Sequence, residues 1–156
     1  MIREWFRKKL KPHYIIGSHD NPYLLRWYLF PRNRWFNVYL HKFCRDDDDR
    51  ALHNHPWFFL SLMFRGQYTE IVSHDHDTGE GRGFVRTAPS VALRKAEHRH
   101  RVVLDSRHGK PVPCWTIAIT GPKVQTWGFF CPKGFVPWYE FVDSDNHGNV
   151  GRGCDE

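Results

Sequence analysis

Apolar side chains along this chain gather in short runs separated by turn residues, a pattern typical of β-strands rather than helices. An aromatic-rich run at 23–30 and an alternating run at 35–43 flank the turn residues of 31–34, which predicts a hairpin. Further strands are predicted at 58–64, at 67–72, as a strand pair within 84–95, and at 114–120. The pattern therefore predicts an all-β fold.

Two features of these strands depend on how they pair. If Arg65 and Gly66 form a two-residue turn, the strands on either side make a second hairpin and share an interior face. That face would carry Phe59, Ser61, Met63, Tyr68, Glu70 and Val72. Within 114–120, the pattern leaves open whether the face of Trp115 or the face of Thr116 is interior.

Histidines stand beside two of the apolar runs. His53 and His55 are two positions apart just before 58–64, so both imidazoles leave the same face of an extended strand. His98 and His100 precede the apolar run 102–104 and also share a face with each other. Imidazole nitrogens are good ligands for divalent transition metals. We expect a metal site made by His53, His55 and one of the later pair.

These residues resemble the two-part metal motif of the cupin superfamily, in which His-x-His, a strand and a glycine precede a second part with one more histidine. The matching residues are His53, His55, Gly66 and His100. Two positions depart: the family's glutamate falls on Phe59, and the glycine of the second part falls on Ser90. The departure resembles three-histidine cupins such as thiol dioxygenases, and the longer pattern resembles small uncharacterised cupin-like proteins of phages and bacteria.

The resemblance implies a single-domain, cupin-type double-stranded β-helix, a jelly-roll barrel, with His53, His55 and His100 as metal ligands. It implies a barrel over 21–142. A basic segment with a short helix is expected at 1–20, a connector at 13–21, and a flexible tail at 143–156. Fe(II) is the favoured ion, and Zn, Ni or Mn are alternatives.

Composition adds a constraint on partners. A length of 156 residues fits one domain, and the formal net charge of +6 favours an anionic partner. Four scattered cysteines without a C-x-x-C pair, and no secretory leader, lead us to expect a cytoplasmic protein. No segment is apolar enough to predict a membrane partner.

Other polar residues are assigned by their position relative to the histidines. Tyr68 or Glu70 would transfer protons, and His98 would lie at the mouth of the site. Arginines would bind the anionic group of a substrate; the candidates are Arg26, Arg45, Arg50, Arg65, Arg94, Arg99 and Arg101, with Arg50, Arg94 and Arg101 preferred. The acidic run at 46–49 is a solvated loop or, alternatively, places Asp49 or a neighbour against a ligand imidazole.

The leading interpretation is a mononuclear Fe(II) oxygenase acting on a small anionic substrate. An alternative is a non-catalytic cupin that binds or sequesters a nucleotide or sugar. A second alternative is nucleic-acid binding through the basic N-terminal hairpin, with steep salt dependence. Exposed strand edges make a homodimer an expectation as well.

Overall fold

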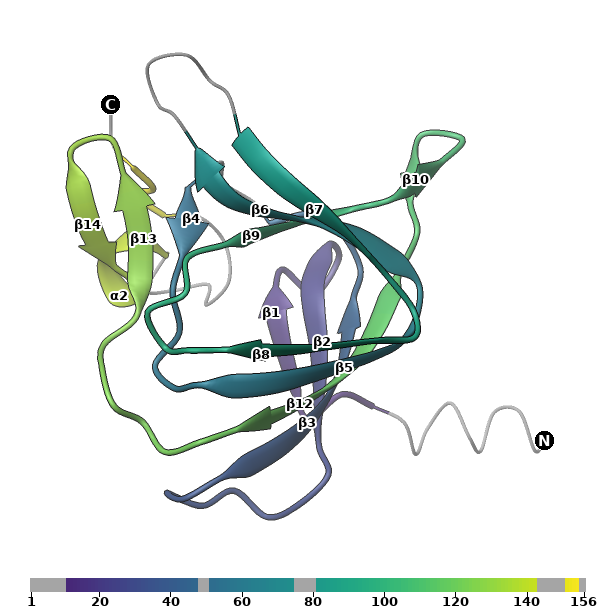
Figure 1. Cartoon of the computed structure of the whole chain (residues 1–156), viewed down its shortest axis with the longest axis horizontal. Helices are drawn as coiled ribbons and strands as arrows, with labels where there is room; N and C mark the ends of the chain where they lie inside the picture. The colour runs from purple at the N-terminus through teal and green to yellow at the C-terminus, as the bar shows by residue number, and fades with distance from the viewer. Residues whose placement is uncertain (1–10, 48–50, 75–80, 143–150, 155–156) are drawn as a thin grey trace.

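The protein is described by a computed structural model, which defines residues 11–47, 51–74, 81–142 and 151–154. These residues form antiparallel sheets that curve around a shared interior (Figure 1). The helix in the described part is the short α2, Trp138–Phe141. The all-β prediction is confirmed, and the short helix expected within 1–20 falls on residues 1–10, outside the described residues. In the described part, no helix has the length and apolar character needed to cross a bilayer.

The largest sheet has the strand order β1-β2-β3-β12-β5-β8. Its strands are β1 (Tyr14–Gly17), β2 (Pro22–Tyr28), β3 (Asn37–Phe43), β12 (Cys114–Thr120), β5 (Phe59–Arg65) and β8 (Ser90–Arg94). Strand β1 lies within the segment expected to be a connector, so the sheet begins earlier in the chain than the pattern indicated. β1 and β8 are its edges, and a homodimer through such an edge stays a prediction.

Two three-stranded sheets complete the structure opposite and beside the large one (Figure 1). The first contains β7 (Gly81–Thr87), β6 (Gln67–His74) and β9 (Arg101–Leu104), and the second contains β14 (Gly134–Pro137), β13 (Gly128–Cys131) and β4 (Leu52–His53). A small ladder joins β10 (Ser106–Arg107) to β11 (Lys110–Pro111). The first of these sheets faces the large sheet across the interior.

The predicted N-terminal hairpin is confirmed by the pairing of β2 with β3. Its turn is held by the side chain of Asn33, whose Oδ1 accepts hydrogen bonds from the backbone N–H of Trp35 and Phe36 at 2.9 and 3.0 Å. Turns of this kind are favoured by asparagine because its short side chain satisfies nearby backbone donors.

The predicted hairpin at Arg65 and Gly66 is wrong. β5 and β6 do not pair; β5 pairs with β8, and β6 pairs with β7. The chain bends at Gly66 and passes from one sheet to the other, and the partner strand bends at Ala88–Pro89, where Ala88 N–H donates to Gly66 O at 3.0 Å. The predicted strand pair within 84–95 is the other side of this same bent two-stranded ribbon.

The bend requires glycine at position 66. Gly66 has a φ of +95°, a conformation that side chains disfavour, and a Cβ there would lie 2.8 Å from Cα of Cys114. Because the backbone of β12 passes this close, the ribbon can fold over the edge of the large sheet only without a side chain at this position.

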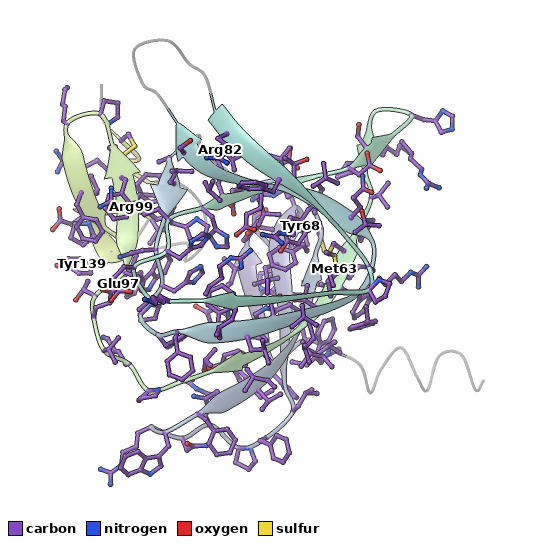
Figure 2. All side chains as sticks on the ribbon, viewed as in Figure 1. Met63, Tyr68, Arg82, Glu97, Arg99 and Tyr139 are labelled. Carbon is purple, nitrogen blue, oxygen red and sulfur yellow. A yellow bond between two sulfur atoms is a disulfide. The ribbon has the colours of Figure 1, made fainter. Side chains whose placement is uncertain are left out.

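The inner face of β12 is the one with small side chains. Thr116, Ala118 and Thr120 are buried, whereas Trp115 and Ile117 are half-buried on the outer face. Farther along the barrel, an apolar cluster fills the interior; its members are Met63, Tyr68, Val102, Leu104 and Cys114. Figure 2 shows Met63 and Tyr68 within the barrel. The predicted inward direction is confirmed for Met63, Tyr68 and Glu70, which are buried, although the pairing was wrong and the ladder is irregular between Ile71 and Ser73, around Val72.

The C-terminal segment is attached to the barrel by a disulfide between Cys131 of β13 and Cys154. Cys131 also packs with Ala51 and Phe141 in a second buried cluster. Residues 151–154 thus contact the domain, contrary to the expectation of a tail that is flexible from 143 to its end. The sequence indicated no cysteine pair, because the two lie 23 positions apart with no spacing motif between them.

Candidate metal centre

Hydrogen bonds at Asn54 and His55, directly after strand β4, hold the first two histidines on one side. Asn54, between His53 and His55, is buried on the opposite side, where its Oδ1 accepts a hydrogen bond from Gly128 N–H at 2.9 Å. The carbonyl of His55 accepts from Gln125 Nε2 at 2.8 Å. With Asn54 anchored away from the interior, both neighbouring imidazoles point into it, as the two-residue spacing predicted.

An isolated β-bridge places the third histidine beside them. His53 and His100 exchange both backbone hydrogen bonds, at 2.9 and 3.0 Å. The ring centroids of His53, His55 and His100 are 5.0 to 5.1 Å from one another, and each residue has a ring nitrogen within 4.8 Å of one from each of the others. The predicted convergence of these three residues is thus seen in the structure.

The nitrogen positions fit a shared metal ion. Nε2 of His55 lies 2.8 Å from Nε2 of His100. Two imidazoles on one ion, with metal–nitrogen bonds of about 2.0–2.1 Å and octahedral to tetrahedral angles, place their nitrogens about 2.8–3.4 Å apart. Phe59, where the resemblance would place a carboxylate ligand, instead packs its ring against His55 at a centroid distance of 4.6 Å. The donor set nearest the three nitrogens therefore consists of imidazoles.

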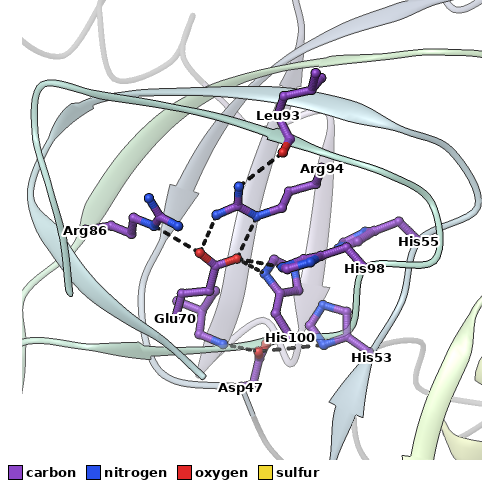
Figure 3. Close-up of polar contacts among 10 residues, drawn as sticks. Asp47, His53, His55, Glu70, Arg86, Leu93, Arg94, His98 and His100 are labelled. Atoms are coloured by element: carbon purple, nitrogen blue, oxygen red, sulfur yellow. Dashed lines mark hydrogen bonds and ion pairs between the residues drawn. The ribbon is translucent and has the colours of Figure 1, made fainter. Parts of the chain in front are cut away.

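A buried carboxylate orients His100 (Figure 3). Glu70 is 0% exposed, and its Oε1 lies 3.0 Å from His100 Nδ1. A carboxylate can only accept, so His100 carries its proton on Nδ1 and directs the lone pair of Nε2 toward the other two histidines. The neutral tautomer needed for metal binding is thereby selected.

Glu70 is held as an anion by its other partners. Arg94 donates to it from Nε at 2.8 Å and also from Nη2, Arg86 donates from Nε at 3.0 Å, and His98 Nε2 lies at 3.0 Å. Burial alone would raise the pKa of Glu70, but hydrogen bonds from His100, His98 and Arg94 outweigh it and lower that pKa below its usual range. At neutral pH this group is a fixed negative charge.

Burial keeps the other imidazoles neutral. It lowers the pKa of His53 to about 4, with Asp47 opposing the effect, and it lowers the pKa of His55 well below its ordinary value, helped by the neighbouring His100 and His53. Asp47 Oδ2 lies 3.8 Å from His53 Nδ1. The neighbour of Asp49 expected to face a ligand imidazole is thus Asp47; Asp49 itself lies outside the described residues. Neutral imidazoles are the form that binds metal ions.

The structure shows the surroundings of two expected substrate arginines, whose role stays a prediction. The guanidinium of Arg94 pairs with Glu70 through Nε and Nη2, donates to Leu93 O through Nη1, and lines the same surface cavity as His98. Arg101 follows His100 at the start of β9, where alternation turns it away from the inner face of Val102, and its Nε is buried without a hydrogen-bond partner among the described residues. Arg50 lies outside the described residues.

The expected proton-transfer residues, Tyr68 and Glu70, both lie in the interior, as the alternation predicted. Tyr68 belongs to the apolar cluster of the barrel, and burial, with the charge of Glu70 adding to it, raises its pKa to about 12. Glu70 enters the interior as predicted, but it is fully paired and ionised. His98, with a side chain 30% exposed, lines a surface cavity of about 410 Å³ beside Arg94, as expected of a residue at the mouth.

Arg86 was missed by sequence reasoning. It lies on β7, and its approach to Glu70 depends on the pairing of β6 with β7, in which Arg86 stands opposite Tyr68. The only signal in the sequence was an arginine within a predicted strand, which is too common to indicate a partner.

Comparison with known proteins identifies the fold. No description of a protein family matches the chain, and no curated protein is similar to it in sequence. Among solved structures, an RmlC-like cupin protein from Ralstonia eutropha has 16% identity, with 81% of this chain and 75% of that one covered and a TM-score of 0.50. A protein described as a putative mannose-6-phosphate isomerase from the same organism has 14% identity, 70% and 92% coverage, and a TM-score of 0.50.

A third similar structure is Fe(II)-HppE with an alternative substrate, (S)-1-HPP, at 11% identity and a TM-score of 0.53. It covers 72% of this chain, and the chain spans 56% of its length. These likenesses, together with the sheet topology, show that the protein has the cupin jelly-roll fold. Within that fold the ligand atoms of His53, His55 and His100 lie close enough to hold a metal ion, and those of Glu70, His98 and His100 form a second such group.

Proposed function

We propose that the protein is a mononuclear metal-dependent enzyme that acts on a small anionic molecule, and that its reaction is an Fe(II)-dependent oxygenation. The observation that carries this proposal is the convergence of three neutral imidazoles, of which His100 is fixed in the metal-binding tautomer by Glu70. A divalent ion in such a site supplies open coordination positions for O₂ and for a chelating substrate.

The charges around the site support an anionic substrate. Neutral imidazoles leave the full charge of a divalent ion in place, and the carboxylate of Glu70 is already balanced by the guanidinium groups of Arg94 and Arg86. Asp47, whose Oδ2 lies 3.8 Å from His53 Nδ1, is the carboxylate that remains beside the described cluster, and one such charge does not balance a divalent ion. An anionic substrate would supply the remaining negative charge.

Within the cluster, proton exchange falls to His98. Its side chain is partly exposed at the surface cavity, and its Nε2 reaches Glu70 directly. The sequence suggested Glu70 and Tyr68 for this role. The pKa of Glu70 is lowered, so this carboxylate stays ionised, and the pKa of Tyr68 is raised to about 12, so this hydroxyl stays protonated. Neither group exchanges a proton readily near neutral pH.

Fe(II)-HppE is a metal-containing protein with the same fold, which supports Fe(II) as the ion. The fold itself hosts many reactions, so the proposal depends on the site rather than on this likeness.

Elemental analysis of the full chain, purified without chelator, tests the proposal. About one equivalent of a transition metal is expected in the unaltered protein and in His19→Ala, whose histidine is exposed away from the site. The double variant His53→Ala/His55→Ala is expected to lose it. Metal retained by the double variant would contradict the assignment, and a metal-free protein that still binds a nucleotide or sugar would favour the non-catalytic alternative.

Nucleic-acid binding remains a second candidate because of the tip of the β2–β3 hairpin. Trp35 and Phe30 are 64% and 57% exposed there, and the guanidinium of Arg34 lies 4.6 Å from the centroid of the Trp35 ring. Exposed aromatic and cationic side chains together can stack on bases and neutralise phosphates. Binding of single-stranded RNA that weakens steeply with salt and is lost in Trp35→Ala would support this candidate.

A further inference from the structure

One arginine points into the barrel with no carboxylate beside it. Arg26 of β2 pairs in register with His41 of β3, which pairs with Thr116 of β12 and, across it, with Met63 of β5. Residues opposite one another in adjacent strands share a face, and His41, Thr116 and Met63 are all buried. Arg26 thus belongs to the inner row of the large sheet.

The contacts of Arg26 position it without neutralising it. Its Nε donates to His41 Nε2 at 2.8 Å, and its Cζ lies 4.7 Å from the centroid of the Tyr39 ring. The Tyr39 and His41 rings stack at 5.6 Å. Burial, and secondarily the charge of Arg26, lowers the pKa of His41 well below its ordinary value, so the acceptor is a neutral imidazole.

Among the described residues, no carboxylate lies within ion-pair distance of Arg26, whereas Arg86 and Arg94 both pair with Glu70. In the same part of the chain, the two terminal nitrogens of Arg26 have no hydrogen-bond partner. A cation turned toward a barrel interior without a counter-ion is costly. Such an arrangement is expected where an anion from outside completes the pair.

The inner row next to Arg26 carries small side chains. In that row, Tyr39 pairs with Ala118, which pairs with Ser61, which pairs with Ala92. Small side chains on the inner face of a small barrel are compatible with a bound small ligand.

Arg26 also lies near the histidine cluster. The ring of Tyr39, on which Arg26 lies, approaches the ring of Trp57 at a centroid distance of 6.4 Å, and Trp57 follows His55 by two positions.

We propose that Arg26 binds the oxyanion group, a carboxylate or a phosphate, of the small molecule whose other end reaches the histidine cluster. His41 and Tyr39 are positioning residues that hold the guanidinium with its terminal nitrogens toward the interior. The part of this inference that concerns the histidine cluster rests on the proposed function. The anion site at Arg26 can be tested without metal.

In the experiment, the metal-free full chain is titrated with inorganic phosphate and, separately, with acetate. Calorimetry and thermal unfolding measure the binding of each anion. Arg26→Gln is compared with Arg107→Gln, a matched control that removes an exposed guanidinium from β10. Loss of a charge-assisted hydrogen-bond pair is expected to weaken binding of the preferred anion at least about tenfold in Arg26→Gln. Arg107→Gln is expected to bind as the unaltered protein does. The anion that binds more tightly identifies the oxyanion class.

Thermal unfolding separates binding from a purely structural role. Without anion, Arg26→Gln should unfold at the same or a higher temperature, because it no longer carries an uncompensated charge. Phosphate should raise the unfolding temperature of the unaltered protein and not that of Arg26→Gln. Arg26→Lys, which keeps the charge, should retain part of the binding. Anion binding that is equal in Arg26→Gln and the unaltered protein would overturn the proposal, as would an Arg26→Gln protein that is destabilised and keeps the phosphate response.

The two proposals can fail separately. Arg26-dependent anion binding in a protein that elemental analysis finds to be free of metal would refute the metal-dependent function and leave the anion site standing. If the protein holds one equivalent of metal and Arg26→Gln binds anions as the unaltered protein does, the anion site is refuted and the metal-dependent function is kept.

Discussion

At the scale of single residues, the partners of a side chain determine its role. Glu70 faces the interior, as the alternation along its strand predicted, yet it does not act where a free carboxylate would. Arg94, Arg86, His98 and His100 all bond to it, so it is an ionised orienting group. Arg26 illustrates the opposite case, since among the described residues it has no acidic partner and keeps an uncompensated charge.

Replacing Glu70 by Gln should weaken metal binding by about 10- to 100-fold, because an amide can donate as well as accept and no longer selects the tautomer of His100. Competition with a chromophoric chelator measures the change. Glu97→Gln, an exposed carboxylate at the same surface cavity, is the control and should keep the original affinity. Equal affinity in Glu70→Gln and Glu97→Gln would show that Glu70 does not orient a ligand.

The metal-free protein should lose stability as the pH falls from about 6.5 to about 4. Burial lowers the pKa of His53 to about 4, whereas an imidazole in the unfolded chain titrates near 6.5. In that interval the unfolded state binds a proton that the folded state does not, so the stability present above pH 6.5 is lost on acidification, by up to about 3 kcal/mol for this residue. His55 acts in the same direction.

Urea unfolding at a series of pH values measures this effect. His53→Gln should show a smaller loss between pH 6.5 and 4, and His19→Gln should behave as the unaltered protein. A His53→Gln variant with an unchanged pH profile would refute the role given to His53.

At the scale of elements, bends matter as much as strands. Strands β5 and β6 form one side of a two-stranded ribbon and β7 and β8 the other, and the ribbon bends at Gly66 and Ala88–Pro89 into both sheets of the barrel. The bend brings Glu70 of one sheet to Arg94 of the other. A simple hairpin at Arg65 and Gly66 would instead have placed these residues in a single layer.

Gly66→Ala should destabilise the protein by about 2–3 kcal/mol, because it combines a disfavoured backbone conformation with a contact of 2.8 Å to Cα of Cys114. Gly109→Ala is a matched control: it also has a positive φ, +72°, but nothing lies within 4 Å of its added Cβ. Its cost should be about 1 kcal/mol. Chemical denaturation measures both, and equal costs would show that the close approach to β12 is not what requires glycine.

At the scale of the whole molecule, the C-terminal segment supports the strand that carries the site. β13 pairs with β4 opposite His53, and the ring of Phe129 stacks on that of Phe141 at 3.6 Å. The disulfide from Cys131 attaches residues 151–154 to the same region. The metal centre is therefore supported by a segment more than seventy positions farther along the chain than Asn54, as the bond from Gly128 to Asn54 also shows.

The double variant Cys131→Ser/Cys154→Ser should be less stable by about 3 kcal/mol, since the bond closes a segment of 23 residues and restricts the unfolded chain. Cys44→Ser, at a half-buried free cysteine, should change stability by less than about 0.5 kcal/mol. Non-reducing urea unfolding measures both. If added reductant leaves the stability of the unaltered protein unchanged, the predicted contribution of the disulfide is wrong.

Local patterns predicted much of this structure and a definite part of its site. The N-terminal hairpin, the strand at 114–120 and the inward direction of Glu70 followed from alternation and turn chemistry. The convergence of His53, His55 and His100 was predicted from the resemblance of these residues to the cupin metal motif, and the structure places their ring nitrogens together. The pairing of β5 with β8 was not predicted, because Gly66 fits a hairpin turn and a bend equally well when its close neighbour, Cys114, is unknown.

The sequence by itself determined which way side chains point along each strand, because that direction repeats every two residues and is set by the local backbone. The tertiary structure alone decided which charges meet: Glu70 with Arg94 and Arg86, and Arg26 with none of the described carboxylates. Such pairing depends on distances in space between residues far apart in the chain, and no local pattern encodes them. The tertiary structure also decided which face of β12 lies inside. Both faces of this strand are compatible with burial, and only packing against the opposing sheet distinguishes them.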